Sequence, residues 1–396
     1  MKMETCRDWR RFGTSTEVKT TMTITKIEAI PVAYTEPNDS NSTRSLMFCR
    51  IETSDGIVGW GEAITQFPEA SRAAAVLLEG LADAVIGRDP LEHHSILAEL
   101  ERRSWWYTYE GGIGAFVMSA IDVALWDLKG KVLGRPVSEL IGGALRHELP
   151  VIASTHAFNS SLDFEIERHG AYVQRDGFRG IKIGMGKRGE ARLGYEFDRD
   201  VDFVAGLREA IGPEALLIMD RGQSLSWNVD EAIRRTQAFN EYRLAWMEEP
   251  LEPQDVEGFR RLRQQVSCLI GTGEREFTVR GYQRLVASGI SDVVGFDPGR
   301  AGGITAGLKV IQLVEAANVW FNAHAWSSAV TTAASIALSA STNRCMIFEM
   351  KPLPNPMHDE LITQPFTQHD GLISVPRGPG LGIEVIESVV ESYRMH

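Results

Sequence analysis

Charged side chains recur at the ends of consecutive short apolar runs in the second half of the chain. In chain order they are Lys182, Asp220, Glu248 (followed by Glu249), Glu274, Asp297, His324 and Glu349. Folding alone does not require a charge at the end of every run. If the runs are strands whose ends converge, each pair of carboxylates at ~4 Å repels by about 4 kcal/mol at an effective dielectric constant of ~20. A bound cation would relieve that repulsion.

The acids of three successive runs favour a hard metal ion. Asp220, Glu248 and Glu274 offer only oxygen donors, with Glu249 as the alternative to Glu248. Such donor sets suit Mg²⁺, or Mn²⁺, better than zinc. A single acid in this position would be interpreted as the cap of the following helix. Three in succession are better explained by a metal site.

The elements that must position these residues form a regular series from Pro150 onward. Short apolar runs alternate with amphipathic helical patterns, which indicates parallel strands buried on both faces. The expected strands are 151–155, 178–184, 215–220, 244–249, 268–274, 292–297, 319–324 and 345–350. Eight units of this kind predict a (β/α) barrel over residues 150–350, with the charged side chains at its catalytic mouth.

The remaining segments predict a second, α+β domain. Over residues 23–143, alternating strand patterns precede longer helical ones, and we expect the tail, 353–396, to pack back on this domain. Residues 1–22 are polar without an apolar signal stretch, so we expect a disordered lead. The aromatic patch 105–109 is expected to lie in the domain core rather than in a pocket wall.

Composition excludes several classes of partner. The 396 residues carry a net charge of −12, which argues against nucleic acid as a ligand. No apolar run reaches the roughly 20 residues of a membrane helix. The four cysteines are scattered without a CxxC pair, which is typical of reduced thiols and a cytoplasmic location. We expect a homo-oligomer that acts on a small molecule.

Several motifs together resemble the enolase superfamily, specifically its mandelate racemase/muconate lactonizing branch. They are Gly177-Phe178-Arg179-Gly180-Ile181-Lys182, Ile218-Met219-Asp220, Trp246-Met247-Glu248-Glu249-Pro250, Gly273-Glu274, Asp297 followed by Gly302-Gly303, and Asn322-Ala323-His324. The resemblance covers nearly everything from Thr23 onward. It implies a modified (β/α)7β TIM-type barrel with an α+β capping domain.

The resemblance also implies roles for individual residues. Asp220, Glu248 and Glu274 would bind Mg²⁺, and His324 would be a base hydrogen-bonded to Asp297. Members of this superfamily use a Lys or His base while the metal stabilises the enediolate formed next to a carboxylate.

The chain departs from the branch at one position. A Lys-x-Lys pair is usual on the second strand, but Lys182 is followed two residues later by Gly184. Racemisation needs acid–base groups on both faces of the carbon, whereas only His324 with Asp297 is plainly present. This favours a one-base dehydratase of acid sugars, in which Lys182 stabilises charge. A sugar-lactone cycloisomerase, a racemase or epimerase, and a non-catalytic protein of the same fold are the alternatives.

Substrate specificity in this family comes from loops of the capping domain. The predicted substrate-binding residues are Arg44 in such a loop, Arg300 behind the sixth strand, and Trp326 and Glu349 near the ends of the last two strands. Gly184-Met185-Gly186-Lys187-Arg188-Gly189 also matches GxGxxG, a weak pattern that suggests dinucleotide binding. That hypothesis leaves Glu248, Glu274 and His324 unexplained.

Overall fold

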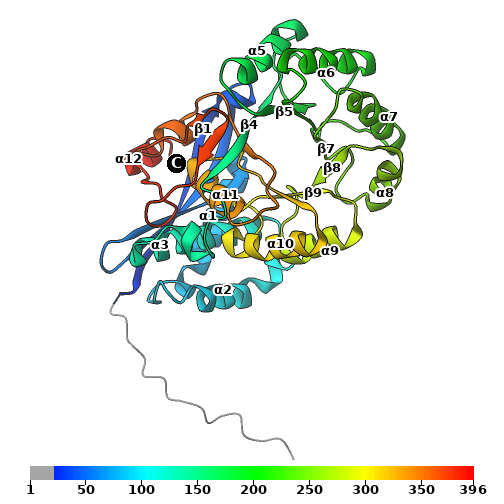
Figure 1. The fold of residues 1–396 in the computed structure, drawn as a ribbon. Coiled ribbons are helices and arrows are strands. Elements are labelled where there is room, and N and C mark those ends of the chain that lie inside the picture. The colour runs from blue at the N-terminus through cyan, green and yellow to red at the C-terminus, as the bar shows by residue number, and fades with distance from the viewer. Residues whose placement is uncertain (1–21) are drawn as a thin grey trace, which may run out of the picture.

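The computed structural model describes residues 22–396. Its larger part is a barrel with helices around its outside (Figure 1), and the barrel is built from eight parallel strands. The strands are β4 (Glu148–His156), β5 (Gly180–Met185), β6 (Leu216–Arg221), β7 (Trp246–Glu248), β8 (Leu269–Thr272), β9 (Val293–Phe296), β10 (Trp320–Ala323) and β11 (Phe348–Met350). The helices between them are α5 (Leu162–Gln174), α6 (Phe197–Ile211), α7 (Val229–Asn240), α8 (Val256–Gln265), α9 (Val279–Ser288), α10 (Gly303–Ala317) and α11 (Ala329–Ala340).

The strands pair in chain order from β4 to β10, and β11 pairs with β4. A bridge between Phe321 and Cys345 joins the β10 strand to the segment before β11. Eight strands with seven intervening helices form the predicted (β/α)7β barrel, because each apolar run is buried by its neighbours and by a covering helix. The strand ends agree with prediction to within about three residues.

The capping part precedes the barrel in the chain. An antiparallel sheet is formed by β1 (Ile24–Glu36), β2 (Ser42–Thr53) and β3 (Val58–Gln66). Its helices are α1 (Pro68–Leu81), α2 (His93–Thr108), α3 (Ile113–Leu133) and the short α4 (Val137–Leu140), with 3-10 turns at Pro37–Asp39 and Ala82–Ala84. This gives the predicted α+β cap.

Helix α3 lies unusually close to β3. A Cβ atom on Gly61 would come within 1.9 Å of the Ala120 carbonyl oxygen, and one on Gly59 within 2.4 Å of the Ala124 carbonyl oxygen. Only glycine permits this approach. The two glycines therefore fix how deeply α3 seats on the sheet.

The tail contacts both parts of the molecule. After a π-helical turn at Pro356–Glu360, β12 (Gln368–His369) and β13 (Leu372–Ser374) form a hairpin, and β13 pairs antiparallel with the start of β4. The last helix, α12 (Glu387–Ser392), leads to Arg394, which forms a bridge with Val32 in β1.

Two buried carboxylates join the cap to the barrel. Glu62 in β3 accepts hydrogen bonds from Ser327, Ser328 and Thr331 at the start of α11. An acid at this end of a helix also interacts favourably with the helix dipole. Glu36 accepts a 2.7 Å bond from Lys351, which follows β11, and both side chains are about 1% exposed. The cap is thereby held over the mouth of the barrel.

Among residues 22–396, none of the helices combines the length and the apolar character that a membrane span requires. The predicted disordered lead falls almost wholly outside the described residues.

Candidate active site

The predicted metal ligands lie on neighbouring strands at the carboxyl end of the barrel. In the parallel register of β6 and β7, Asp220 is the partner of Glu248. Glu274 follows β8 by two residues. One layer below, Ile218 and Trp246 belong to an apolar cluster. Since side chains alternate along a strand, Asp220 and Glu248 share the inward direction of Ile218 and Trp246.

Each of these carboxylates faces a different cation. Lys182 Nζ donates to Glu248 Oε1 at 2.7 Å, Lys187 Nζ lies 3.5 Å from Asp220 Oδ2, and His324 Nε2 lies 3.7 Å from Glu274 Oε2. Within residues 22–396, no group of three or more His, Cys, Asp or Glu side chains is arranged so that it could hold a metal ion. Binding one ion with these three ligands would require their side chains to turn from the cations toward a shared point.

The electrostatics of the site explain why a cation would suit it. Burial, reinforced by Glu349, Asp220 and Glu274, raises the pKa of Glu248 well above its ordinary range despite Lys182. Burial alone would lower the pKa of Lys182, but the surrounding carboxylates hold it well above its usual value. The site thus contains more buried negative charge than Lys182 balances. An all-oxygen donor set under mutual repulsion fits a hard divalent cation.

Glu249, the alternative acid directly after β7, is already paired. Its carboxylate accepts from Arg275 Nε at 2.5 Å and from Thr272 Oγ1 at 3.3 Å. Burial and the nearby Glu274 raise the pKa of Glu249 to about 7. Glu249 nevertheless lines the cavity at the barrel mouth. Because Glu249 is already paired with Arg275, Glu248 is the favoured ligand. Glu249 remains the alternative, because it lines the cavity.

His324 and Asp297 form the expected hydrogen-bonded pair. His324 Nδ1 lies 2.7 Å from Asp297 Oδ2, and Asp297 is fully buried. The other carboxylate oxygen of Asp297 accepts from the Gly299 backbone N–H at 2.8 Å. Burial would lower the pKa of His324, but Glu274 and Asp297 raise it. With Nδ1 engaged, Nε2 is the nitrogen available to a substrate.

These residues share a cavity of about 360 Å³ at the barrel mouth. Lys182, Asp220, Glu274 and His324 line it. Two of the predicted substrate-binding residues, Arg44 and Trp326, also line it. The Arg44 guanidinium lies over the Trp326 ring, 4.8 Å from the ring centroid. It also forms an ion pair of 3.0 Å with Asp39.

The other two predicted substrate-binding residues are occupied by the protein itself. Glu349 is buried and accepts from Lys182 at 3.1 Å, Asn322 at 2.6 Å and Ser154 at 2.9 Å. Arg300 Nη1 donates to the backbone carbonyl of Glu274 at 2.9 Å. Both line the cavity. In this structure Glu349 therefore holds the Lys182 side chain in place, and Arg300 holds the backbone of Glu274.

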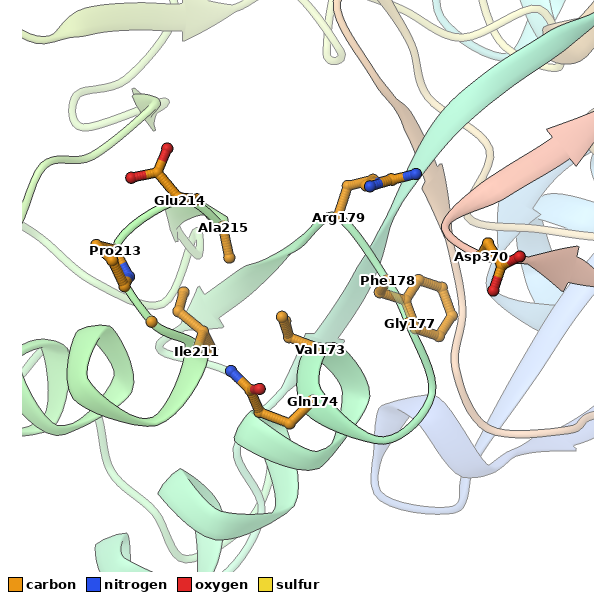
Figure 2. Close-up of a pocket in the computed structure, with 11 residues that line it drawn as sticks. Val173, Gln174, Gly177, Phe178, Arg179, Ile211, Pro213, Glu214, Ala215 and Asp370 are labelled. Atoms are coloured by element: carbon orange, nitrogen blue, oxygen red, sulfur yellow. The ribbon is translucent and has the colours of Figure 1, made fainter.

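A larger cavity, of about 520 Å³, lies at the opposite end of the barrel (Figure 2). Arg179 and Ala215 in its lining precede β5 and β6, so it opens at the amino-terminal end of the strands. Figure 2 shows its two acids, Glu214 and Asp370, on opposite sides. This cavity exceeds the one at the barrel mouth in volume, but it has no converging charged groups.

The aromatic patch does not lie in the domain core, so that expectation is wrong. At the end of α2, the exposed fractions are 59% for Trp105, 79% for Trp106 and 58% for Tyr109. Trp105 and Tyr109 line a separate cavity between the cap and α9–α10. The helical register that turns Leu100 and Ser104 inward turns these rings outward.

Two of the residues that line the cavity at the barrel mouth, His156 and Lys187, were not among the predicted site residues. His156 ends β4, the one barrel strand for which no charged or polar end residue was considered, and the strand pattern itself could have identified it. Lys187 reaches Asp220 from the loop after β5, and only the fold reveals that. The same loop corrects the GxGxxG hypothesis, because the next helix begins only at Phe197 rather than directly after the glycines.

Comparison with known proteins identifies the family. Residues 16–142 match the mandelate racemase/muconate lactonizing enzyme N-terminal domain, and residues 166–389 match the enolase C-terminal domain-like family. The chain therefore belongs to the enolase superfamily, in its mandelate racemase/muconate lactonizing branch, as the motifs indicated.

The similar proteins include a dehydratase, a cycloisomerase and a racemase. The chain is 34% identical to the D-gluconate dehydratase of Thermoproteus tenax, over 94% of this chain and 74% of that protein. The structure of the 3,6-anhydro-D-galactonate cycloisomerase from Zobellia galactanivorans superposes with a TM-score of 0.85 at 28% identity, covering 94% and 100% of the two chains. A racemase from Streptomyces coelicolor A3(2) with bound magnesium gives a TM-score of 0.81 at 25% identity, covering 94% and 100%.

Proposed function

We propose that this enzyme removes the proton next to the carboxylate of an acid sugar and then eliminates water from the neighbouring carbon. The observation that carries this proposal is the His324–Asp297 pair, because the His324 side chain lines the same cavity as Lys182, Asp220 and Glu274. A base beside a site that can stabilise an enediolate is the requirement for this chemistry. The name of the Thermoproteus relative, a dehydratase, supports the second step.

Mg²⁺, or Mn²⁺ in its place, is the proposed cofactor. Asp220, Glu248 and Glu274 would hold it, because they supply oxygen donors from adjacent strands whose repulsion a dication relieves. The ion would stabilise the negative charge that develops on the substrate carboxylate. Lys182 would add a fixed positive charge beside it, since its pKa stays well above neutrality.

The protein's own groups would move the protons from one face of the carbon. His324 takes the α-proton on Nε2, while Asp297 stabilises the resulting imidazolium through Nδ1. The same imidazolium then protonates the departing β-hydroxyl. Gly184 leaves no side chain at the usual position of a second base.

A sugar-lactone cycloisomerase is the second candidate, supported by the name of the Zobellia structure. The two share the first proton transfer and differ in what leaves the enediolate. They are separated by their products.

The test is turnover of a panel of acid sugars and their lactones with purified enzyme. Dehydration gives a 2-keto-3-deoxy acid that is lighter than its substrate by one water, whereas cycloisomerisation opens the ring of a lactone or anhydro acid and gives a keto acid of unchanged mass. A carbonyl reagent detects both products, and mass spectrometry separates them. Chelation should abolish activity, and Mg²⁺ or Mn²⁺ should restore it. Full activity in metal-free enzyme, or no turnover of any acid sugar, would overturn the proposal.

We further propose a homo-oligomer in the cytoplasm, with domain limits of 23–143 and 353–396 for the cap and 150–350 for the barrel. The exposed rings of Trp105 and Trp106 support a subunit contact, since such patches are usually covered. The free thiols of Cys49, Cys268 and Cys345 support a reducing compartment.

A further inference from the structure

Gly184 stands where two other side chains already fill the space. In the register of β4 and β5, Gly184 is the partner of His156. A Cβ atom on Gly184 would lie 2.5 Å from His156 Nδ1 and 2.5 Å from Lys187 Cε. Both distances are too short for any real contact. The space that a side chain at position 184 would need is therefore not empty, because the imidazole ring of His156 occupies it.

His156 is held firmly in this position. Its ring packs on Trp326, with centroids 4.7 Å apart and planes inclined by 34°. The Phe158 ring lies edge-on to it, with the ring centroids 6.4 Å apart. Only 7% of the residue is exposed, and that residue lines the active-site cavity. Two aromatic neighbours and the backbone of Gly184 thus limit the ring to one orientation.

The ring has an unused hydrogen-bonding group. His156 Nδ1 is buried and has no hydrogen-bond partner among residues 22–396. The Nδ1–Cε1 edge lies against Gly184, so Nε2 is the nitrogen through which the ring can contact a ligand in the cavity.

We propose that His156 is a substrate-positioning residue, and that Gly184 is required because it makes room for the His156 ring. His156 donates a hydrogen bond to, or accepts one from, a hydroxyl group of the acid sugar, while Trp326 supports the ring from behind. This inference rests on the proposed function for the nature of the ligand, but not for the packing of His156 against Gly184.

The charge state of the ring suits a hydroxyl rather than a carboxylate. Burial, together with the positive charges of Lys187, Arg44 and Lys182, holds the pKa of His156 well below its usual value. The ring is therefore neutral near pH 7. A neutral imidazole pairs with the hydroxyl groups of a sugar chain and discriminates among their stereochemical arrangements. His324, by contrast, is kept basic by Glu274 and Asp297.

A double-mutant cycle tests the packing claim without any assay of activity. Gly184→Ala should lower the melting temperature, because the added methyl group collides with the His156 ring. In a His156→Ala background the same change should cost much less, so the two substitutions should not be additive. Equal costs of Gly184→Ala in both backgrounds would refute the packing claim. If Gly184→Ala does not fold alone, recovery of folding in the double variant supports the claim, and failure of the double variant counts against it.

Substrate kinetics test the positioning claim. His156→Phe preserves stacking on Trp326 but removes both nitrogens, so KM for the best acid sugar of the panel should rise by about 2–10-fold. The change in kcat should be smaller, since proton transfer belongs to His324. His147→Phe, the same substitution at the exposed residue just before β4, is the matched control. An unchanged KM and an unchanged preference among stereoisomeric aldonates in His156→Phe would overturn the inference.

These outcomes are distinct from failure of the proposed function. If wild-type enzyme turns over no acid sugar, the proposed function fails. The double-mutant cycle still tests the packing of His156 against Gly184, because it measures melting temperatures rather than activity. If wild-type enzyme is active and His156→Phe is indistinguishable from it, only the present inference fails.

Discussion

The two ends of the barrel differ in how many charged side chains they bury. At the carboxyl end, Lys182, Glu248, Glu349 and Asp297 are all buried. At the amino end, Arg179, Glu214 and Asp370 around the larger cavity are exposed to solvent. Buried carboxylates that repel one another destabilise a fold unless a ligand compensates them. The comparison shows that buried charge, rather than cavity volume, distinguishes the carboxyl end, where we place the active site.

The largest expected effect at the catalytic end comes from His324. His324→Asn should lower kcat by two to four orders of magnitude or more, because one residue is both base and acid in the proposed mechanism. In D₂O the variant should show no exchange of the substrate α-proton. Lys182→Met should slow exchange without abolishing it, since Lys182 stabilises charge rather than accepting the proton.

The same exchange experiment can contradict the one-face mechanism. Native enzyme should exchange deuterium, if at all, with retention of configuration. Exchange with inversion would mean that a second base exists, and a racemase or epimerase would then replace the dehydratase. Lys182 would be the first group to examine.

An intermediate effect should distinguish the two acids at the end of β7, Glu248 and Glu249. Glu248→Gln should weaken Mg²⁺ binding by at least about tenfold in calorimetry, because it removes a ligand. Glu249→Gln should have a smaller effect, since Glu249 is engaged by Arg275 at 2.5 Å. The reverse order would assign the ligand to Glu249 and show that Arg275 releases it when metal binds.

The smallest effect is expected at the amino end. Arg179→Ala should change kcat/KM by less than about twofold and the free energy of unfolding by about 0.5 kcal/mol or less, as at most exposed sites. A loss of activity comparable to that of Lys182→Met would break the comparison, because it would place function at both ends of the barrel.

The barrel was predictable from sequence because its signal is local. Each strand is a short apolar run that ends near a charged residue, so strand positions and the residues at their ends follow from the pattern alone. His324 and Asp297 were paired through the family resemblance, and the structure places them 2.7 Å apart.

The parts that escaped prediction depend on contacts between distant segments. The volume at Gly184 is filled by His156 from another strand and by Lys187 from a loop, and no periodicity encodes either contact. The outward orientation of Trp105 and Trp106 depends on which face of α2 meets the cap core. Such facts are decided by tertiary packing rather than by local pattern.

The buried pair of Glu36 and Lys351 also bears on how the molecule assembles. Its two partners are 315 positions apart in the chain, so a ribosome must synthesise almost the whole protein before the pair can close. Until then, the carboxylate of Glu36 in the emerging cap has no ammonium group to offset its burial, and the cap should remain loosely packed. Contacts of such high sequence separation slow folding. We therefore expect the cap, although synthesised first, to acquire its final stability last.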